Sequence, residues 1–167
     1  AYRDFVGGGI LDEETMLKFV NAIGRDNARF PMHWDDSDNA GFTTGTPWIS
    51  VNENYKKINA AAQVNDPDSI FSYYKKLIEL RHQMEIIVYG VYKSKAIEHP
   101  DVFAYTRTLG DEKLFVVCNF REQEMDFTLE DGFTGDEKVM ISNYDDVVKT
   151  ENGIYLRPYE AKVFYRK

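Results

Sequence analysis

Carboxylate side chains are the most abundant groups in this sequence that could perform hydrolysis. Asp and Glu number 28 against 20 Lys and Arg, so the composition permits a carboxylate pair acting as acid and nucleophile. Most of these carboxylates lie in expected turns or on expected exposed faces, where solvation explains them. No pair stands out as a general acid and a nucleophile, and we expect no catalytic residue in the chain.

Covalent catalysis by a serine or cysteine nucleophile has no support. Cys118 is the only cysteine and ends the apolar run Leu114–Cys118, which is typical of a buried strand. No Gly-x-Ser-x-Gly turn, which would expose a nucleophilic serine, occurs in the chain. A single cysteine also excludes an internal disulfide and favours a reducing compartment, so we expect a cytoplasmic protein.

Metal ions are not expected either. The three histidines, His33, His82 and His99, lie far apart in the sequence, and none has a second ligand at metal spacing. The segment 36–41 resembles the start of a calcium-binding loop. Its fifth position is Ala40, however, and its twelfth position is Pro47 instead of glutamate.

A bound cofactor is not indicated by the glycine pattern. Gly7, Gly8 and Gly9 are adjacent, and the third glycine of a dinucleotide-binding motif would fall at Asp12. A flexible loop is the better interpretation of this triplet.

Composition indicates a folded protein with room for one domain or two small ones. The 167 residues are 43% hydrophobic and carry a formal net charge of −8, which argues against disorder and against binding to nucleic acid. Residues 1–9 lack the basic start and long apolar run of a signal peptide. No apolar stretch reaches membrane-spanning length, so we expect no membrane partner.

The first half of the chain is expected to contain two helices separated by a long loop. Asp12 can cap a helix that continues to a stop at Gly24. Residues 25–65 lose periodicity and are rich in Asp, Asn, Gly and Thr, which indicates a long irregular loop. Residues 69–84 place apolar side chains on one helical face and form the second helix.

The second half is expected to be an antiparallel β-sandwich, with a domain boundary between residues 85 and 86. Short β-prone runs are separated by turn residues such as Asp131-Gly132 and Asn152-Gly153. The expected strands are 86–92, 102–108, 113–120, 124–129, 138–142, 154–156 and 161–165. We therefore divide the chain into domains at 1–85 and 86–167.

One long segment carries a family resemblance. Residues 24–36 read Gly-Arg-Asp-Asn-Ala-Arg-Phe-Pro-Met-His-Trp-Asp-Asp, and residues 39–49 read Asn-Ala-Gly-Phe-Thr-Thr-Gly-Thr-Pro-Trp-Ile. The chain resembles the α-amylase superfamily (glycoside hydrolase family 13) over about residues 24–167. Within it, the chain is most similar to the branch containing oligo-1,6-glucosidase, dextran glucosidase, trehalose-6-phosphate hydrolase and sucrose isomerase.

Other segments agree with this branch, and two positions depart from it. The agreeing segments are 51–55, 68–71, 80–81, 104–107 and 156–161. Phe30 stands where the branch usually has Thr, and His33 where it usually has Gln. These departures concern fine specificity, and residues 1–23 match the branch poorly.

The resemblance implies an α+β chain. Residues 1–85 would be the C-terminal end of a (β/α)₈ catalytic barrel, comprising its long active-site loop and its last helix. An antiparallel β-sandwich C-terminal domain follows in residues 86–167. It also implies retaining hydrolysis of terminal α-glucosidic bonds of oligosaccharides, with α-1,6 bonds the favoured linkage. All three catalytic carboxylates would lie upstream of Ala1, in the remainder of the barrel, so the isolated chain is expected to be inactive.

By the same resemblance, Arg25 is the substrate-binding residue and matches the family arginine that recognises the non-reducing glucose. A guanidinium suits this role because it stays charged and offers several fixed donors. Alternatively, Arg25 and Arg29 only pin the loop through ion pairs with Asp26, Asp35 or Asp36, and we favour that role for Arg29.

Two further alternatives concern aromatic residues and the class of protein. Trp34, Phe42 and Trp48 could stack on sugars, but aromatic side chains in a packed loop more often form a local core, which is what we expect here. The chain could also be an independent carbohydrate-binding or structural β-sandwich module. A module of that kind should present an exposed aromatic strip on its sheet and bind sugar by itself.

Overall fold

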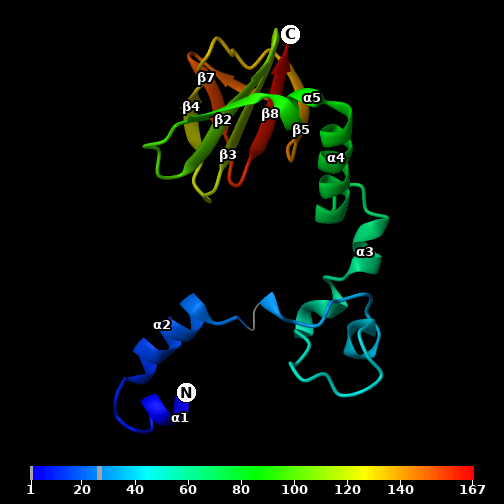
Figure 1. The fold of residues 1–167 in the computed structure, drawn as a ribbon, viewed down its shortest axis with the longest axis vertical. Coiled ribbons are helices and arrows are strands. Elements are labelled where there is room, and N and C mark those ends of the chain that lie inside the picture. The colour runs from blue at the N-terminus through cyan, green and yellow to red at the C-terminus, as the bar shows by residue number, and fades with distance from the viewer. Residues whose placement is uncertain (1, 26–27) are drawn as a thin grey trace. The chain divides into compact units, whose positions relative to one another are not determined.

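The computed structural model describes residues 2–25 and 28–167. The chain divides into two compact units, Ala1–Ser72 and Tyr73–Lys167. The first contains helices and loops, and the second contains the strands (Figure 1). No helix in the described part of the chain is long and apolar enough to cross a bilayer.

The first unit begins with α1 (Tyr2–Phe5) and α2 (Glu13–Ile23). The carboxylate of Asp12 caps α2 by accepting a hydrogen bond from Thr15 N at 2.8 Å, and Gly24 ends the helix, as predicted. Among the residues of α2 only Met16 is buried. The short helices that follow are η2 (Asp38–Gly41), η3 (Glu53–Lys56) and α3 (Ala60–Val64).

The second predicted helix is confirmed as α4 (Ile70–Gln83). Ser69 caps its start, because its hydroxyl oxygen lies 3.1 Å from the Ser72 N–H. The predicted strand 86–92 is wrong in its first half, which is the short helix α5 (Glu85–Tyr89). Ile86 is fully buried in α5, so its β-branched side chain serves helix packing.

Eight strands occur in the second unit, all paired antiparallel. They are β1 (Val91–Lys95), β2 (Val102–Leu109), β3 (Glu112–Asn119), β4 (Met125–Thr128), β5 (Lys138–Ser142), β6 (Val148–Thr150), β7 (Gly153–Leu156) and β8 (Ala161–Arg166). The order is β1-β2-β3-β8-β5 in one sheet and β4-β7-β6 in the other. Every predicted strand after residue 100 is confirmed, and β6 was not predicted.

The two sheets enclose one apolar core, which confirms the β-sandwich. Both sheets contribute large side chains to it, including Phe115 and Phe164 from the larger sheet and Phe127 and Ile154 from the smaller one. Phe115 contacts Phe127 and Phe133, with ring centroids 6.3 and 5.3 Å apart. On β2, β3 and β7, alternate residues face this core.

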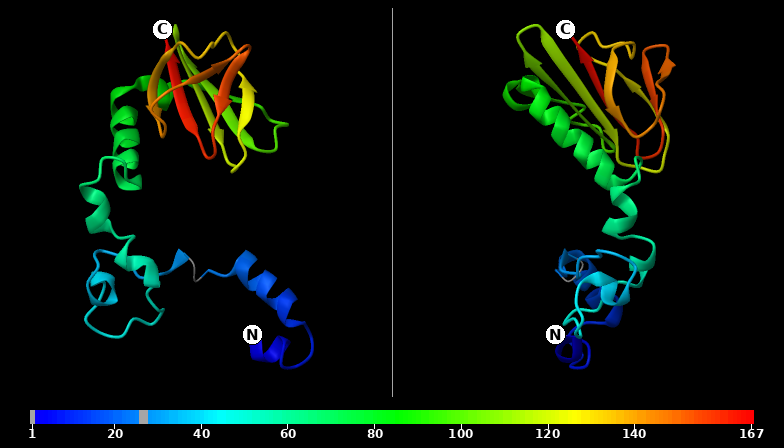
Figure 2. Two further views of the ribbon diagram at one scale, coloured as in Figure 1. Left: turned by 180° about the vertical axis from the view of Figure 1, so that it is seen from behind. Right: turned by 90° about the vertical axis from the view of Figure 1, so that its right-hand side faces the viewer.

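The outer face of the larger sheet is partly covered by helix. Figure 2 (right) shows α4 beside this sheet, on the side away from β4, β6 and β7. Leu77, Leu80 and Met84 of the helical segment line a small apolar pocket with Val116 and Val163 of the sheet. At the end of α5, Arg107 donates a hydrogen bond to Gly90 O at 3.0 Å, which fixes the chain reversal into β1.

The predicted boundary between residues 85 and 86 stays a prediction.

A buried ionic cluster lies at the start of β8. Glu160 is fully buried and Lys162 is 1% exposed, and the two form an ion pair. Arg157 adds hydrogen bonds from Nε and Nη2 to the Glu160 carboxylate, both at 3.0 Å. Its guanidinium also lies 4.0 Å from the ring centroid of Tyr144. Burial by itself raises the pKa of Glu160. The hydrogen bonds from Arg157 and Lys162 lower it by more than burial raises it, so the pKa of Glu160 lies below its ordinary value.

Replacing Glu160 by Gln should strongly destabilise the β-sandwich. Gln keeps the shape of the side chain but leaves Lys162 buried without a counter-charge, and breaking a buried pair costs about 3–5 kcal/mol. The Glu160 pKa is lower in the folded than in the unfolded state. Its contribution is therefore present above the ordinary glutamate pKa of about 4.3 and is lost as the pH falls through the folded-state pKa. Urea unfolding followed by circular dichroism at several pH values measures both effects.

The matched control is Asp136→Asn. Asp136 pairs with Lys149 at 2.6 Å, but its side chain is 69% exposed, so solvent screens the pair and this change should have little effect on stability. Equal destabilisation by the two substitutions near neutral pH would show that burial of Glu160 does not matter.

Candidate functional site

Arg25 is exposed and lies two residues after the end of α2, at the start of the long loop. Its carbonyl oxygen accepts a hydrogen bond from Ala28 N at 3.1 Å. Within residues 2–25 and 28–167, no ion pair holds the guanidinium of Arg25 or of Arg29. Asp26, one of the expected partners, lies outside the described residues. A guanidinium is a donor only, so the Arg25 side chain can donate hydrogen bonds to hydroxyl or carboxylate groups.

The segment around His33 is tied to the start of α3. His33 Nδ1 lies 3.0 Å from Ile58 O, and since a carbonyl only accepts, Nδ1 carries the proton. The carbonyl oxygens of His33 and Trp34 accept hydrogen bonds from the Ala60 and Ala61 amides, both at 2.9 Å. His33 Nε2 is buried and has no hydrogen-bond partner among the described residues. These bonds set the direction in which the chain enters the loop at Asp35.

Residues 35–45 form a tight loop with an unusual backbone. Asn39, Ala40 and Gly41 have φ values of 52°, 57° and 65°, a left-handed run that costs energy for residues other than Gly. Two sets of hydrogen bonds hold it. Ala40 O accepts from the Trp34 amide at 2.9 Å, and the Asn39 side-chain amide donates to the carbonyls of residues 43 and 45, both at 3.1 Å.

The carboxylate of Asp35 organises the interior of this loop. It accepts hydrogen bonds from the hydroxyl and the backbone N–H of Ser37, and the hydroxyl bond is the main reason that the pKa of Asp35 is lowered. A Cβ atom at position 41 would lie 2.7 Å from an Asp35 carboxylate oxygen. Gly41 is therefore required both by its φ and by the space that Asp35 occupies.

Lys56 of η3 holds the loop at Asp36. Its ammonium donates to Asp36 O at 2.8 Å and lies 4.7 Å from the ring centroid of Tyr55. With Lys56, loop residues 36–39 and 41–44 line an open, largely polar groove. Hydroxyl, amide and carboxylate groups of this kind can exchange hydrogen bonds with a polyhydroxylated ligand. Among the described residues, no three potential His, Cys, Asp or Glu ligands come together as a metal site.

The expected local aromatic core does not form. Trp48 is 84% exposed, and Trp34 and Phe42 are 54% and 49% exposed. Most of the loop is open, and the hydrophobic residue buried within it is the small Ala40. A loop of this length has too few apolar neighbours of its own to bury three large rings.

Protein-family models match both units of the chain. The model described as "Alpha amylase, catalytic domain" matches residues 8–90, and "Alpha-amylase SusG C-terminal domain" matches residues 102–163. The chain belongs to the α-amylase superfamily. Because the first match begins at residue 8, the expectation that residues 1–23 match poorly is wrong for most of that segment.

Relatives within the superfamily agree in sequence and in structure. The oligo-1,6-glucosidase of Parageobacillus thermoglucosidasius is 52% identical over 92% of this chain and 28% of its own length. A trehalose-6-phosphate hydrolase structure from Bacillus licheniformis has a TM-score of 0.87 and 41% identity, covering 98% of this chain and 30% of that one. The structure of an isomaltulose synthase mutant from Erwinia rhapontici, in complex with sucrose, has a TM-score of 0.86 and 41% identity, with the same shares covered.

The chain spans less than a third of the length of these α-amylase relatives. The role of Arg25 stays a prediction. Sequence reasoning predicted the long irregular loop, but it did not reveal the left-handed run at residues 39–41. Only the Asn-Ala-Gly triplet could have indicated that run, because Asn and Gly tolerate positive φ.

Replacing Gly41 by Ala should loosen the loop. The new methyl group meets the Asp35 carboxylate and the backbone stays left-handed, which together should cost about 1–3 kcal/mol. Amide hydrogen exchange at Trp34, whose N–H bonds to Ala40 O, should then accelerate by roughly tenfold or more.

Gly45→Ala is the control, because the nearest atom to a Cβ there is Thr43 Oγ1 at an ordinary 3.7 Å. If both variants leave exchange at Trp34 unchanged, Gly41 is not the residue that sets the loop conformation.

Proposed function

We propose that the chain is the C-terminal portion of a retaining α-glucosidase that hydrolyses terminal α-glucosidic bonds, favouring α-1,6 bonds, of oligosaccharides. The catalytic carboxylates lie outside these 167 residues. The observation that carries the proposal is the 52% identity to an oligo-1,6-glucosidase, with only 28% of that relative's length covered. A cytoplasmic location belongs to the same proposal and rests on the single, half-buried Cys118.

Exposed apolar side chains support a protein partner, the remainder of the (β/α)₈ barrel. In α2, Leu17, Phe19, Val20 and Ile23 are 47%, 52%, 45% and 75% exposed. In α4, Ile70, Phe71, Tyr74 and Ile78 are exposed by 46% or more. Both helices lie within the match to the catalytic domain. Apolar surfaces of this extent are the kind that other elements of a barrel cover.

Arg25 is proposed as the substrate-binding residue for the non-reducing glucose. The residue is exposed, and its guanidinium forms no ion pair with the described residues. The ordered loop from His33 to Gly45 follows it in the chain. We keep Arg29 as a scaffold residue.

The isolated chain should release no glucose from isomaltose or from an aryl α-glucoside. Binding residues without a nucleophile and a general acid cannot perform a double displacement. Trp34 and Trp48 are both exposed in the first unit, so their fluorescence should be typical of water-exposed indole. Co-expression with the upstream residues of the longer protein should shift that emission to the blue and restore hydrolysis. Glucose release above background by the purified chain would contradict the proposal.

In the full-length enzyme, Arg25→Lys should lower kcat/KM by about ten- to a hundred-fold or more. Lys cannot reproduce a guanidinium that donates at once to a sugar hydroxyl and a neighbouring carboxylate, and a lost charged hydrogen bond costs roughly 1.5–3 kcal/mol. Thermal stability should change little.

Arg29→Lys serves as the matched control and should leave kcat/KM within about twofold, because a scaffold role acts through stability. The assignment fails if Arg25→Lys instead lowers the melting temperature and keeps nearly normal kinetics.

A further inference from the structure

Three aromatic side chains form a row on the edge of the larger sheet, the aromatic strip of Tyr92, Tyr105 and Phe103. The Tyr92 and Tyr105 ring centroids are 5.1 Å apart, and those of Tyr105 and Phe103 are 5.6 Å apart. Tyr92 is 50% exposed and Phe103 is 47% exposed. The strip therefore presents ring surface to solvent over two adjacent strands.

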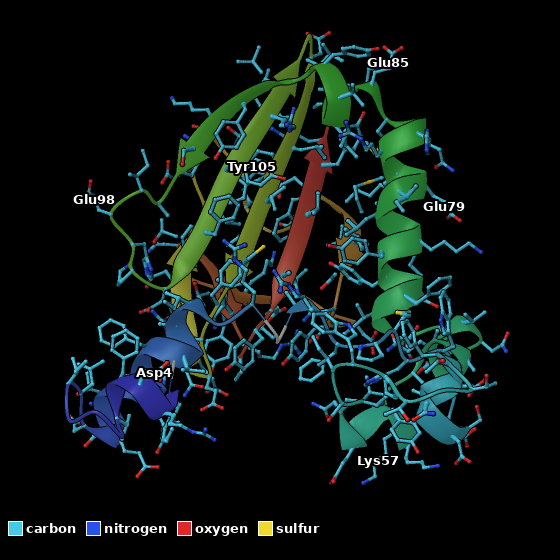
Figure 3. All side chains as sticks on the ribbon, turned by 60° about the horizontal axis from the view of Figure 1, so that its bottom comes forward. Asp4, Lys57, Glu79, Glu85, Glu98 and Tyr105 are labelled. Atoms are coloured by element: carbon cyan, nitrogen blue, oxygen red, sulfur yellow. The ribbon has the colours of Figure 1, made fainter. Side chains whose placement is uncertain are left out.

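Strand register places the strip on the outer face of the sheet. On β2, Val102, Ala104 and Thr106 are buried toward the sandwich, so Phe103 and Tyr105 face the opposite way. Tyr92 of β1 lies opposite Arg107 of β2 in the register. Arg107 lies on the same face of β2 as Phe103 and Tyr105, so the Tyr92 side chain lies on that face too. Figure 3 shows the labelled Tyr105 on β2, on the face along which α4 runs.

Helices α4 and α5 cover only part of this face. Leu77 and Leu80 of α4 reach the pocket wall formed by Tyr105, Leu114 and Val116. Outside this pocket, Tyr92 on β1 and Phe103 near the start of β2 keep about half of their surface exposed. Tyr105 therefore lies between the covered and the open part of the face, and its ring packs against Tyr92 and Phe103.

Polar groups flank the rings. Arg107 donates one N–H to Gly90 O at 3.0 Å, which holds its guanidinium beside the strip, and a guanidinium has five N–H donors. The Ser94 hydroxyl stands opposite Tyr105 in the register, and the two tyrosines bring phenol groups. An aromatic row with hydrogen-bonding groups at its margin matches a pyranose, which has an apolar C–H face and a rim of hydroxyls.

The free surface of α4 differs from the strip in composition. Ile70 and Ile78 make that helix surface partly aliphatic, and it lies in the segment matched to the catalytic domain. The strip is wholly aromatic and begins at β1, next to the segment matched to the C-terminal domain. The net charge of −8 also suits a neutral ligand better than an anionic one.

We propose that the aromatic strip is a carbohydrate-binding surface of the C-terminal domain. Its ligand is a neutral oligosaccharide that stacks its pyranose rings on Tyr92 and Phe103. The choice of α-linked glucose units rests on the proposed function. Binding at the strip needs no catalytic carboxylate, so it can be tested on the chain by itself.

The test is a titration of the 167-residue chain with isomaltotriose, measured by saturation-transfer NMR and by calorimetry. Saturable binding is expected, with magnetisation transferred to the C–H protons of the sugar. Tyr92→Ala and Phe103→Ala should each weaken binding by at least about tenfold, which corresponds to roughly 1.4 kcal/mol. Phe120→Ala is the matched control, because Phe120 is 64% exposed and does not belong to the strip, and it should leave the affinity unchanged.

Phe103→Leu separates ring stacking from simple apolar contact. Leu keeps an apolar side chain but has no ring face, so sugar binding should fall nearly as far as in the Ala variant. Urea unfolding midpoints equal to that of the parent chain confirm that the variants are folded.

Absence of saturable binding overturns the proposal. Binding that persists in both Ala variants, or that Phe103→Leu leaves intact, overturns it as well. The proposed glucosidase activity is tested separately, by hydrolysis in the longer protein, so the two proposals can fail independently.

Discussion

The five-stranded sheet carries apolar side chains on both of its faces, and this property determines how the second unit is built. On the central strand β3, the adjacent residues Leu114 and Phe115 are 2% and 0% exposed although they point to opposite sides. A sheet of this kind needs two covers. The three-stranded sheet supplies one, and the helical segment from Leu77 to Ile87 supplies the other. The helical cover accordingly belongs to the same compact unit as the sheets, and this unit begins at Tyr73, inside α4.

Most of the sandwich could be predicted because its strands follow simple patterns. Phe127 and Leu129 are buried and alternate with exposed Asp126 and Thr128, as a half-buried antiparallel strand requires. The errors lie where tertiary contacts override local preference. Residues 86–89 are β-branched or aromatic, yet they form a helix because Ile86 packs into the unit and Arg107 holds Gly90.

The buried charges illustrate a second limit of sequence patterns. Lys162 occupies an inward position of β8, two residues before Phe164, and both are buried. Alternation alone would place a lysine outward. It can lie inside only because Glu160 and Ser142 accept hydrogen bonds from its ammonium. Nothing in the local sequence shows that a carboxylate two residues earlier will also be buried.

The candidate site shows the converse situation, in which motif recognition succeeded and reasoning about burial failed. The motif around Arg25 placed the chain in its family, whereas the expected core of Trp34, Phe42 and Trp48 is open to solvent. Burial of a loop side chain depends on neighbours that the loop does not contain, so local composition could not settle it.

The distribution of exposed apolar surface follows the same logic. It is extensive on α2 and α4, within the match to the catalytic domain, while the sandwich encloses its own core. Helices α2 and α4 therefore keep their local structure through the caps Asp12 and Ser69 and their backbone hydrogen bonds, although their apolar faces stay open to solvent.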